Sequence, residues 1–303
     1  DAQSKIYSDA DPTLTVNVGG QGLVGSDTQA SVLSGALSTA TGASATAGTH
    51  AITQGSLTIA SNDYQLGQFT AGTLTVAKAA LTVTADAARK TYGDADPSLT
   101  YTVNPAQLKY TDTASAVSGV ILSTATGASA TAGTHAITAT GGTAANYTLT
   151  LADNTLTVDK AALTVTADAQ RKTYGAADPS LTYTVDSTQL KYTDTASVVS
   201  GVNLSTATGA SATAGTHTIT AAGGTAANYD LTLANNTLTV DKAALTVTAD
   251  AKRKTYGDTD PTLTYAVDTA QLKYTDSDSV VSGVNLSTAT GASATAGTHA
   301  ITA

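Results

Sequence analysis

The stretch that decides the fold is Arg-Lys-Thr-Tyr-Gly at residues 89–93, because it returns at residues 171–175 and again at residues 253–257. Each return lies 82 residues further along the chain, and the surrounding sequence returns with it. A fixed period of this kind is typical of tandem-repeat proteins, in which each copy is one structural unit. The chain is therefore expected to fold as an array of similar small units.

Four imperfect copies of the repeat fill the chain. Their expected bounds are residues 1–78, 79–160, 161–242 and 243–303. With these bounds the first copy, which is the divergent one, lacks its opening strand, and the last copy is truncated. A missing strand leaves an open sheet edge that can pair with another chain. A fragment cut within a longer array and strand exchange between molecules both agree with this pattern.

All acidic residues of the chain are aspartates, and the sequence contains no glutamate, cysteine, methionine or tryptophan. Aspartate competes for backbone hydrogen bonds and favours turns and caps, whereas glutamate favours helices. Threonine and valine, which favour strands, are abundant. The composition therefore predicts a β-rich fold with many turns.

The chain is acidic, with a formal net charge of −9 and a calculated pI of about 4.6. No nucleic-acid partner is expected, because phosphate binding requires clustered lysine and arginine, and the sequence has no such cluster. No membrane insertion is expected in this segment, because no apolar run reaches the roughly 18–20 residues that cross a bilayer. The lack of cysteine excludes disulfides and thiolate metal sites, and it suits an exported bacterial protein.

Apolar and polar residues alternate in short segments of each copy, which is the pattern of half-buried strands. In the second copy Leu81, Val83 and Ala85 alternate with threonine and aspartate. The strands expected there are residues 81–86, 99–103, 120–125, 134–139, 147–151 and 156–158. Residues 112–119 begin with Asp-Thr and end with Gly119, which favours a short helix.

Two further details follow from the same alternation. The alternation of apolar and polar residues changes phase between Leu151 and Leu156, which predicts a tight hairpin or a bulge at residues 153–154. The pair Gly141-Gly142 is expected in a loop. The whole pattern predicts a small mainly β unit with one short helix, β-grasp-like in its topology, and an Ig-like β-sandwich is the alternative.

Short connections between copies predict an extended rod. Only four residues separate Val158 of the second copy from Leu163 of the third. Four extended residues cover at most about 14 Å, whereas a compact unit of this length is roughly 30 Å wide. Adjacent copies are therefore not expected to fold back side by side.

Several motifs of the second copy resemble the MBG repeat in its Tyr-Gly form. They are residues 90–101, 112–115, 133–137, Asn146-Tyr147 and 154–158, and the match extends over essentially the whole chain. MBG repeats occur in large bacterial surface proteins, including filamentous haemagglutinin-like adhesins. The resemblance implies work at the bacterial cell surface in long tandem arrays, and it assigns no catalytic residue.

The Asp-x-Asp-Pro turns offer the one candidate metal site. Their carboxylates are candidate calcium ligands, because calcium prefers six to eight oxygen ligands; the residues concerned are Asp94, Asp96, Asp258 and Asp260. Two carboxylates per turn are too few alone, and the third copy has Ala176 in place of the first aspartate. The alternative is that these aspartates cap their own turns. No other cofactor is expected.

Tyrosines recur in every copy, and aromatic rings with polar tips suit both core packing and sugar binding. Most of them lie on apolar faces and are expected in the core. The exceptions are the candidate ligand-binding residues Tyr110, Tyr192 and Tyr274, which follow a lysine in a polar stretch. The single histidine of each copy has no cysteine or glutamate beside it and is expected at the rim of the core.

The functional hypothesis is a structural stalk in a secreted bacterial surface adhesin, which holds a distal binding region away from the cell. No enzyme activity is expected, because each copy repeats the same catalytically silent residues. The expected partners are neighbouring copies in the same chain. The alternative is a multivalent weak binding module for host glycan or matrix protein, whose avidity grows with copy number.

Overall fold

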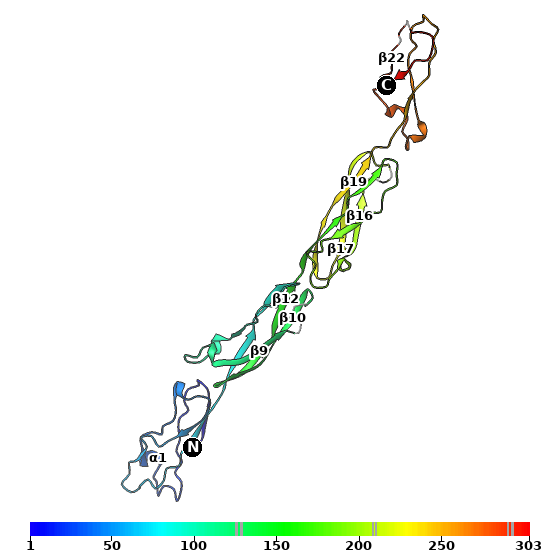
Figure 1. Cartoon of the computed structure of the whole chain (residues 1–303). Coiled ribbons are helices and arrows are strands. Elements are labelled where there is room, and N and C mark those ends of the chain that lie inside the picture. Colours follow the sequence, from blue (N-terminus) through cyan, green and yellow to red (C-terminus); the bar gives the residue numbers. More distant parts are fainter. Residues whose placement is uncertain (125–126, 128–129, 208, 210, 290, 292–293) are drawn as a thin grey trace. The chain divides into compact units, whose positions relative to one another are not determined.

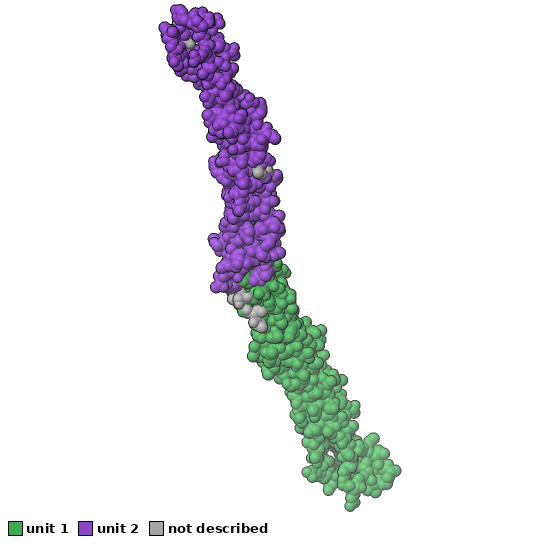
Figure 2. Space-filling model, turned by 90° about the vertical axis from the view of Figure 1, so that its right-hand side faces the viewer, with its two compact units in different colours: residues 1–160 green, residues 161–303 purple. Residues whose placement is uncertain are grey.

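The computed structural model describes residues 1–124, 127, 130–207, 209, 211–289, 291 and 294–303. The chain divides into two compact units, residues 1–160 and 161–303, shown in green and purple in Figure 2. Strands dominate both units, and the one α-helix among the described residues is the single turn α1 (Gln29–Val32). The prediction of a mainly β chain with several small sheets in tandem is confirmed.

The second copy contains two sheets, drawn in cyan and green around β9, β10 and β12 in Figure 1. The first sheet, in the order β11-β6-β8, consists of β6 (Ala79–Ala85), β8 (Tyr101–Val103) and β11 (Tyr147–Ala152). The second sheet, in the order β7-β12-β10-β9, consists of β7 (Ala88–Thr91), β9 (Val117–Thr124), β10 (Gly133–Ala144) and β12 (Asn154–Asp159).

Residues 79–91 and residues 147–159 lie side by side and run in the same direction, first in one sheet and then in the other. β11 pairs with β6, with Leu149 opposite Leu81, and β12 pairs with β7, with Val158 opposite Lys90. Both pairings join residues 68 positions apart, so the chain keeps its direction between the sheets. The chain therefore makes no hairpin at Asp153, and the phase change in the sequence marks a change of sheet.

The core of this copy follows the alternation seen in the sequence. Leu81, Val83 and Ala85 of β6 are fully buried, while the threonines between them are only partly buried. Ile137 of β10 and Leu156 of β12 are also fully buried. Burial of such side chains is the main driving force for folding, and each contributes roughly 1.5–3 kcal/mol.

The segment expected to form a short helix contains only a 3-10 turn, η3 (Ala114–Ala116), and β9 begins at the next residue. A second 3-10 turn, η2 (Pro105–Gln107), was not expected from the sequence. Its Gln107 side chain accepts a hydrogen bond from the backbone N–H of Thr82 at 2.7 Å. This contact fixes the turn against β6.

The Gly141-Gly142 pair lies inside β10, so the expected loop is wrong. Both glycines have a positive φ, +70° and +85°. A Cβ atom on Gly142 would lie 3.0 Å from Val120 and 3.1 Å from Leu149. The strand therefore continues through glycine because β9 and β11 approach it too closely for a side chain.

The first copy is more irregular than the second. Its main sheet has the order β1-β5-β3, and a small sheet pairs β2 with β4. The elements are β1 (Gln3–Ile6), β2 (Leu33–Ser34), the 3-10 turn η1 (Gly42–Ser44), β3 (Gly48–Ile52), β4 (Thr58–Ile59) and β5 (Gly72–Ala77).

Unit 2 begins with the third copy, which repeats the two-sheet arrangement. Its elements are β13 (Ala161–Ala167), β14 (Gln170–Thr173), β15 (Tyr183–Val185), η4 (Ala196–Val198), β16 (Ser200–Thr206), β17 (Gly215–Thr225), β18 (Tyr229–Ala234) and β19 (Asn236–Asp241). The last copy contains β20 (Val247–Ala249), β21 (Tyr265–Val267), η5 (Thr269–Gln271), η6 (Asp278–Val280), β22 (Ser287–Thr288) and β23 (Ile301–Thr302).

Ser8 occupies a turn position that is glycine in the other copies, and it adopts a φ of +78°. This conformation is strained for serine and relaxed for glycine. We expect Ser8→Gly to raise the free energy of unfolding of unit 1 by about 1 kcal/mol, and Gly93→Ser to lower it by about as much. Thermal unfolding monitored by circular dichroism measures both, and equal effects of the same sign would contradict the assignment.

Candidate functional site

Successive copies within unit 1 are joined by a single residue. β5 of the first copy ends at Ala77 and β6 of the second begins at Ala79, so only Lys78 lies between the strands. Its Nζ donates a hydrogen bond to the backbone oxygen of Ala144 at 2.8 Å. The connection is therefore held to the second copy by its own side chain.

A single hydrophobic core spans the first and second copies. Its buried members are Tyr7, Ala45, Ile52, Leu74 and Val76 from the first copy, and Ala79, Leu81, Val83, Val103, Val117, Ala144 and Tyr147 from the second. A core shared in this way couples the stability of the two copies, because neither can open without exposing apolar surface of the other.

Three tyrosines and one aspartate, which we call the junction cluster, meet at this boundary: Tyr7, Tyr110, Asp112 and Tyr147. Asp112 Oδ2 accepts hydrogen bonds from the Tyr147 hydroxyl at 2.6 Å and from the Tyr7 hydroxyl at 3.1 Å. The Tyr7 ring packs edge-on against Tyr147 and Tyr110, with centroids 5.6 and 5.5 Å apart. Tyr7 comes from the first copy, so the cluster links the copies by packing and by charge-assisted hydrogen bonds.

The cluster is built on a tight turn. The backbone N–H of Asp112 donates to Lys109 O at 2.9 Å, and the Lys109 N–H donates to the Tyr147 hydroxyl at 2.8 Å. Tyr110, between them, has a φ of +51°, which is rare for an aromatic residue. Strain of this kind persists only where the surroundings hold it, and the Tyr110 ring is held by its edge-on contact with Tyr7.

The same arrangement of a tyrosine hydroxyl between an aspartate and a backbone N–H recurs in the first and third copies. Tyr229 donates to Asp194 at 2.6 Å and accepts from Lys191 N at 2.8 Å. In the divergent first copy, Tyr64 donates to Asp27 at 2.9 Å and accepts from Val24 N at 2.8 Å. The equivalence of these groups was not visible in the sequence of the first copy, because an insertion shifts its spacing.

A partial junction cluster also lies within unit 2, between the third and last copies. Tyr174 packs edge-on against Tyr274, with ring centroids 5.7 Å apart. Burial, followed by a hydrogen bond to Asp276, raises the pKa of Tyr174 above its usual value. Tyr274 has a φ of +54°, close to that of Tyr110. The contact between tyrosines of adjacent copies is thus repeated along the chain.

Burial, followed by the hydrogen bond to Asp112, raises the pKa of Tyr147 from 10.0 to about 12. Below pH 10 the hydroxyl is protonated in both the folded and unfolded states. Between pH 10 and 12 the unfolded chain loses this proton first, so the free energy of unfolding of unit 1 should fall across this window by roughly 2–3 kcal/mol. Urea unfolding at increasing pH measures the loss, and an equally steep loss in a Tyr147→Phe variant would contradict this origin.

Each copy also holds a lysine ammonium group among oxygens. Lys90 Nζ lies 2.6 Å from Asp96 Oδ1, 3.2 Å from Asp94 O and 3.1 Å from Gly127 O, and its side chain is only 2% exposed. The Asp94 carboxylate accepts a bond from the Thr91 N–H at 3.4 Å. The Asp-x-Asp turn therefore surrounds a cation that the protein itself supplies.

The same lysine–aspartate pair occurs in all four copies, with nitrogen–oxygen distances of 2.5–2.6 Å. In the last copy Lys254 bonds to Asp260 Oδ1 and to the backbone oxygen of Asp258. This role of the lysine was not predicted from the sequence. The signal was a lysine six residues before the second aspartate, which persists in the copy that has Ala176.

All four copies also match a known protein family. The family model described as MBG domain (YGX type) matches residues 1–75, 81–157, 163–239 and 245–303. The chain belongs to the MBG domain family. The resemblance found in the sequence is thereby confirmed for all four copies. A comparison with curated proteins found no match to the chain.

Two of the three tyrosine candidates, Tyr110 and Tyr274, lie at junctions between domains of one unit. Tyr110, Tyr192 and Tyr274 are 48%, 50% and 52% exposed, so each ring presents part of its surface to solvent. Tyr110 and Tyr274 use another part to contact a tyrosine of the preceding domain. Ligand binding by these three rings stays a prediction, whereas Tyr110 and Tyr274 also pack against a neighbouring tyrosine.

The histidine of each MBG domain bonds to its own strand connection. His135 Nε2 lies 2.7 Å from Thr131 O, and His50, His217 and His299 make the equivalent bond. His135 is partly buried beside Leu156 in the second sheet. This position agrees with a packing role at the rim of the core.

The contacts of the lysine ammonium groups argue against calcium binding at the Asp-x-Asp turns. The aspartate oxygens nearest the turn already contact an ammonium group, and the described residues contain no cluster of three or more His, Cys, Asp or Glu side chains placed to hold a metal. We expect removal of calcium with a chelator to leave the thermal midpoint unchanged within about 1 °C. Differential scanning calorimetry measures this, and a large drop that calcium restores would revive Asp94, Asp96, Asp258 and Asp260 as ligands.

Proposed function

We propose that these four MBG domains form a structural stalk, a spacer segment in a secreted bacterial surface adhesin that holds a distal binding region away from the cell. The domains are residues 1–78, 79–160, 161–242 and 243–303. The hydrophobic core shared by the first two domains carries the proposal, because it resists rotation of one domain against the next. Nothing in this role requires a catalytic residue.

The junction supplies the stiffness that a stalk requires. A one-residue connection at Lys78 leaves little conformational freedom between domains. Burial of Tyr7 against the next domain adds a further restraint, since bending would expose its ring and break its bond to Asp112. The net charge of −9 and the threonine-rich sheet faces keep the surface hydrated.

Small-angle X-ray scattering of the 303-residue chain tests the stalk. A compact globule of this length has a radius of gyration of about 19 Å. A stalk should give a value well above that and a scattering profile of rod form. A Tyr7→Ala variant should keep its strand content while its profile becomes more flexible. A globular profile of the unaltered chain would refute the proposal.

Extracellular placement at the bacterial cell surface belongs to the same proposal. It agrees with the lack of cysteine and with the absence of clustered basic residues for nucleic acid. Within the residues that the structure describes, no helix is long and apolar enough to cross a membrane. Surface labelling of intact cells that express the whole protein tests this placement.

The half-exposed tyrosines favour a second function, multivalent weak binding to host glycan or matrix protein. Tyr110, Tyr192 and Tyr274 repeat with the domains, so several weak contacts can act together. Glycan-array and matrix-protein binding by the 303-residue chain tests this function. The triple alanine variant at these positions should lose the binding, and a clean absence of binding by the unaltered chain would leave the stalk alone.

A further inference from the structure

Tyrosines of adjacent copies lie close together at two places in the chain. In unit 1 the rings of Tyr7 and Tyr110 meet edge to face, with centroids 5.5 Å apart. In unit 2 the rings of Tyr174 and Tyr274, which hold the same two places in their own copies, meet edge to face at 5.7 Å. Ring packing of this kind needs no hydroxyl group, whereas the coupling chemistry of phenols needs one on each ring.

The two rings of each pair differ in their access to solvent. Tyr110 and Tyr274 are about half exposed, whereas Tyr7 is buried and Tyr174 is partly buried. The exposed member also has a positive φ in both pairs, and strained backbone positions cluster at functional sites. Each pair therefore combines a phenol that an oxidant in solution can reach with a protected phenol close enough to pass an electron to it.

A carboxylate lies beside the hydroxyl of each protected phenol. The Tyr7 hydroxyl donates a hydrogen bond to Asp112 Oδ2 at 3.1 Å. The Tyr174 hydroxyl is hydrogen-bonded to Asp276, which is the counterpart of Asp112 in the last copy. Removal of one electron from a phenol releases its hydroxyl proton, and a hydrogen-bonded carboxylate is a suitable acceptor for that proton. Each protected tyrosine thus has its proton acceptor in place.

The composition of the chain directs oxidation to tyrosine. The sequence has 13 tyrosines and contains no cysteine, methionine or tryptophan. Cysteine and methionine are the side chains that peroxides usually oxidise first, and tryptophan competes with tyrosine for one-electron oxidants. Because all three are absent, tyrosine is the most readily oxidised side chain of this protein.

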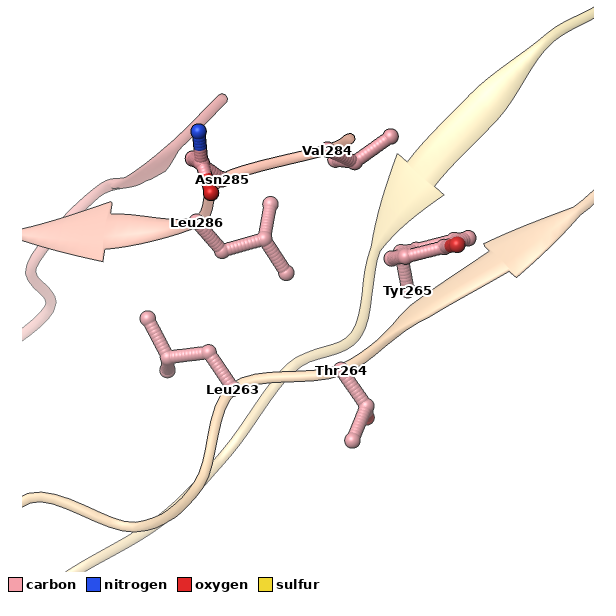
Figure 3. A pocket seen from close by; sticks show the side chains of 6 residues that line it. All are labelled: Leu263, Thr264, Tyr265, Val284, Asn285 and Leu286. Atoms are coloured by element: carbon pink, nitrogen blue, oxygen red, sulfur yellow. The ribbon is translucent and has the colours of Figure 1, made fainter. Parts of the chain in front are cut away.

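A tyrosine away from the tyrosine pairs has different neighbours. Tyr265 lines a cavity of about 430 Å³ in the last copy, and Figure 3 shows it there together with the side chains of Leu263 and Leu286. Among the described residues that line this cavity, Tyr265 is the one tyrosine. Its hydroxyl donates to the backbone oxygen of Val281 at 3.4 Å. The cavity offers it no second phenol for coupling, so Tyr265 serves as an internal control.

From these observations we propose that two tyrosine pairs, Tyr7 with Tyr110 and Tyr174 with Tyr274, are oxidative cross-linking sites. A peroxide, used by a one-electron oxidant of the haem peroxidase class, joins the two rings of each pair as dityrosine. The bond between Tyr7 and Tyr110 closes a loop of about a hundred residues, and a cross-link over such a loop stabilises the folded state. It fixes one copy to the next, independently of any role as a stalk.

The coupling step balances without a further reactant. Each phenol loses one electron and its hydroxyl proton, and the proton of Tyr7 passes to Asp112. The two phenoxyl radicals form a carbon–carbon bond between ring carbons that neighbour the hydroxyl-bearing carbons. The hydrogen atoms on these two carbons move to the oxygens and restore both phenols. The two electrons and two protons that leave the pair reduce one hydrogen peroxide to two water molecules.

Treatment of the dilute 303-residue chain with a haem peroxidase and hydrogen peroxide tests the proposal. The expected product is a monomer that has lost two hydrogen atoms for each bond and shows dityrosine fluorescence. Cleavage before aspartate should release residues 1–8 joined to residues 96–111, and residues 168–177 joined to residues 268–275. Mass spectrometry identifies both joined peptides.

Reciprocal variants assign the two bonds. Tyr110→Phe should lose the joined peptide of unit 1 and keep that of unit 2, and Tyr274→Phe should do the reverse, because phenylalanine forms no phenoxyl radical. Tyr265→Phe should keep both. Circular dichroism checks that each variant retains its strand content. Cross-links that form only between separate chains, or a joined peptide containing Tyr7 that survives Tyr110→Phe, would overturn the proposal.

Discussion

Tyr7→Ala is expected to lower the free energy of unfolding of unit 1 by about 3–5 kcal/mol. Tyr7 is 3% exposed and packs into the core shared by the first and second domains. Its loss leaves a cavity between Tyr110 and Tyr147 and removes one of the two hydroxyls on Asp112. The effect should appear in both domains, because they share this core.

Amide hydrogen exchange of the whole chain measures this effect strand by strand. Protection should fall in β1, β3 and β5 of the first domain and in β6 of the second. Tyr256→Ala is the matched control, since Tyr256 holds the same place in the motif of the last domain and is 72% exposed. We expect the control to change stability by less than about 0.5 kcal/mol. An effect confined to the first domain would show that the domains are not coupled.

Lys90→Met should lower the free energy of unfolding of unit 1 by about 3 kcal/mol. Methionine keeps much of the volume of the buried stem but removes the ammonium group. The Asp96 carboxylate and the backbone oxygens of Asp94 and Gly127 would then lose their shared donor. Because the Asp96 side chain is 28% exposed, water can restore part of the loss.

Lys254→Met provides the graded comparison. Its ammonium group makes the equivalent contacts, but its side chain is 19% exposed compared with 2% for Lys90. The expected loss in the last domain is therefore smaller, roughly 1–2 kcal/mol. Urea unfolding read by hydrogen exchange in each unit compares the two, and a loss below about 0.5 kcal/mol for Lys90→Met would refute a structural role for the ammonium group.

Local patterns predicted much of each domain. The alternation of Leu81, Val83 and Ala85 identified β6 and its buried face, because side chains on a strand alternate between two sides. The same alternation gave a wrong prediction of a hairpin at Asp153. A strand that passes to another sheet and a strand that reverses direction both shift the phase of the alternation. Gly141 and Gly142 were placed in a loop because the sequence cannot show that two strands approach them closely.

The candidate site also combines features that the sequence predicted with features that only the structure revealed. The aspartates of the Asp-x-Asp turns were found from their spacing, but the cation among them was not, since the lysine lies on the preceding strand. Tyr110, which the sequence set apart from the core tyrosines, is 48% exposed. Its contact with Tyr7, which lies more than a hundred residues earlier, depends on the packing of one domain against the next.

The sequence by itself determined the repeat, the β-rich character and the family, because period, alternation and motif are local properties of the chain. Only the tertiary structure decided that adjacent domains of unit 1 share one core and that lysine serves as the cation of each turn. Each of these depends on contacts between residues far apart in the sequence, whose free energy comes from burial and charge pairing that no local pattern records.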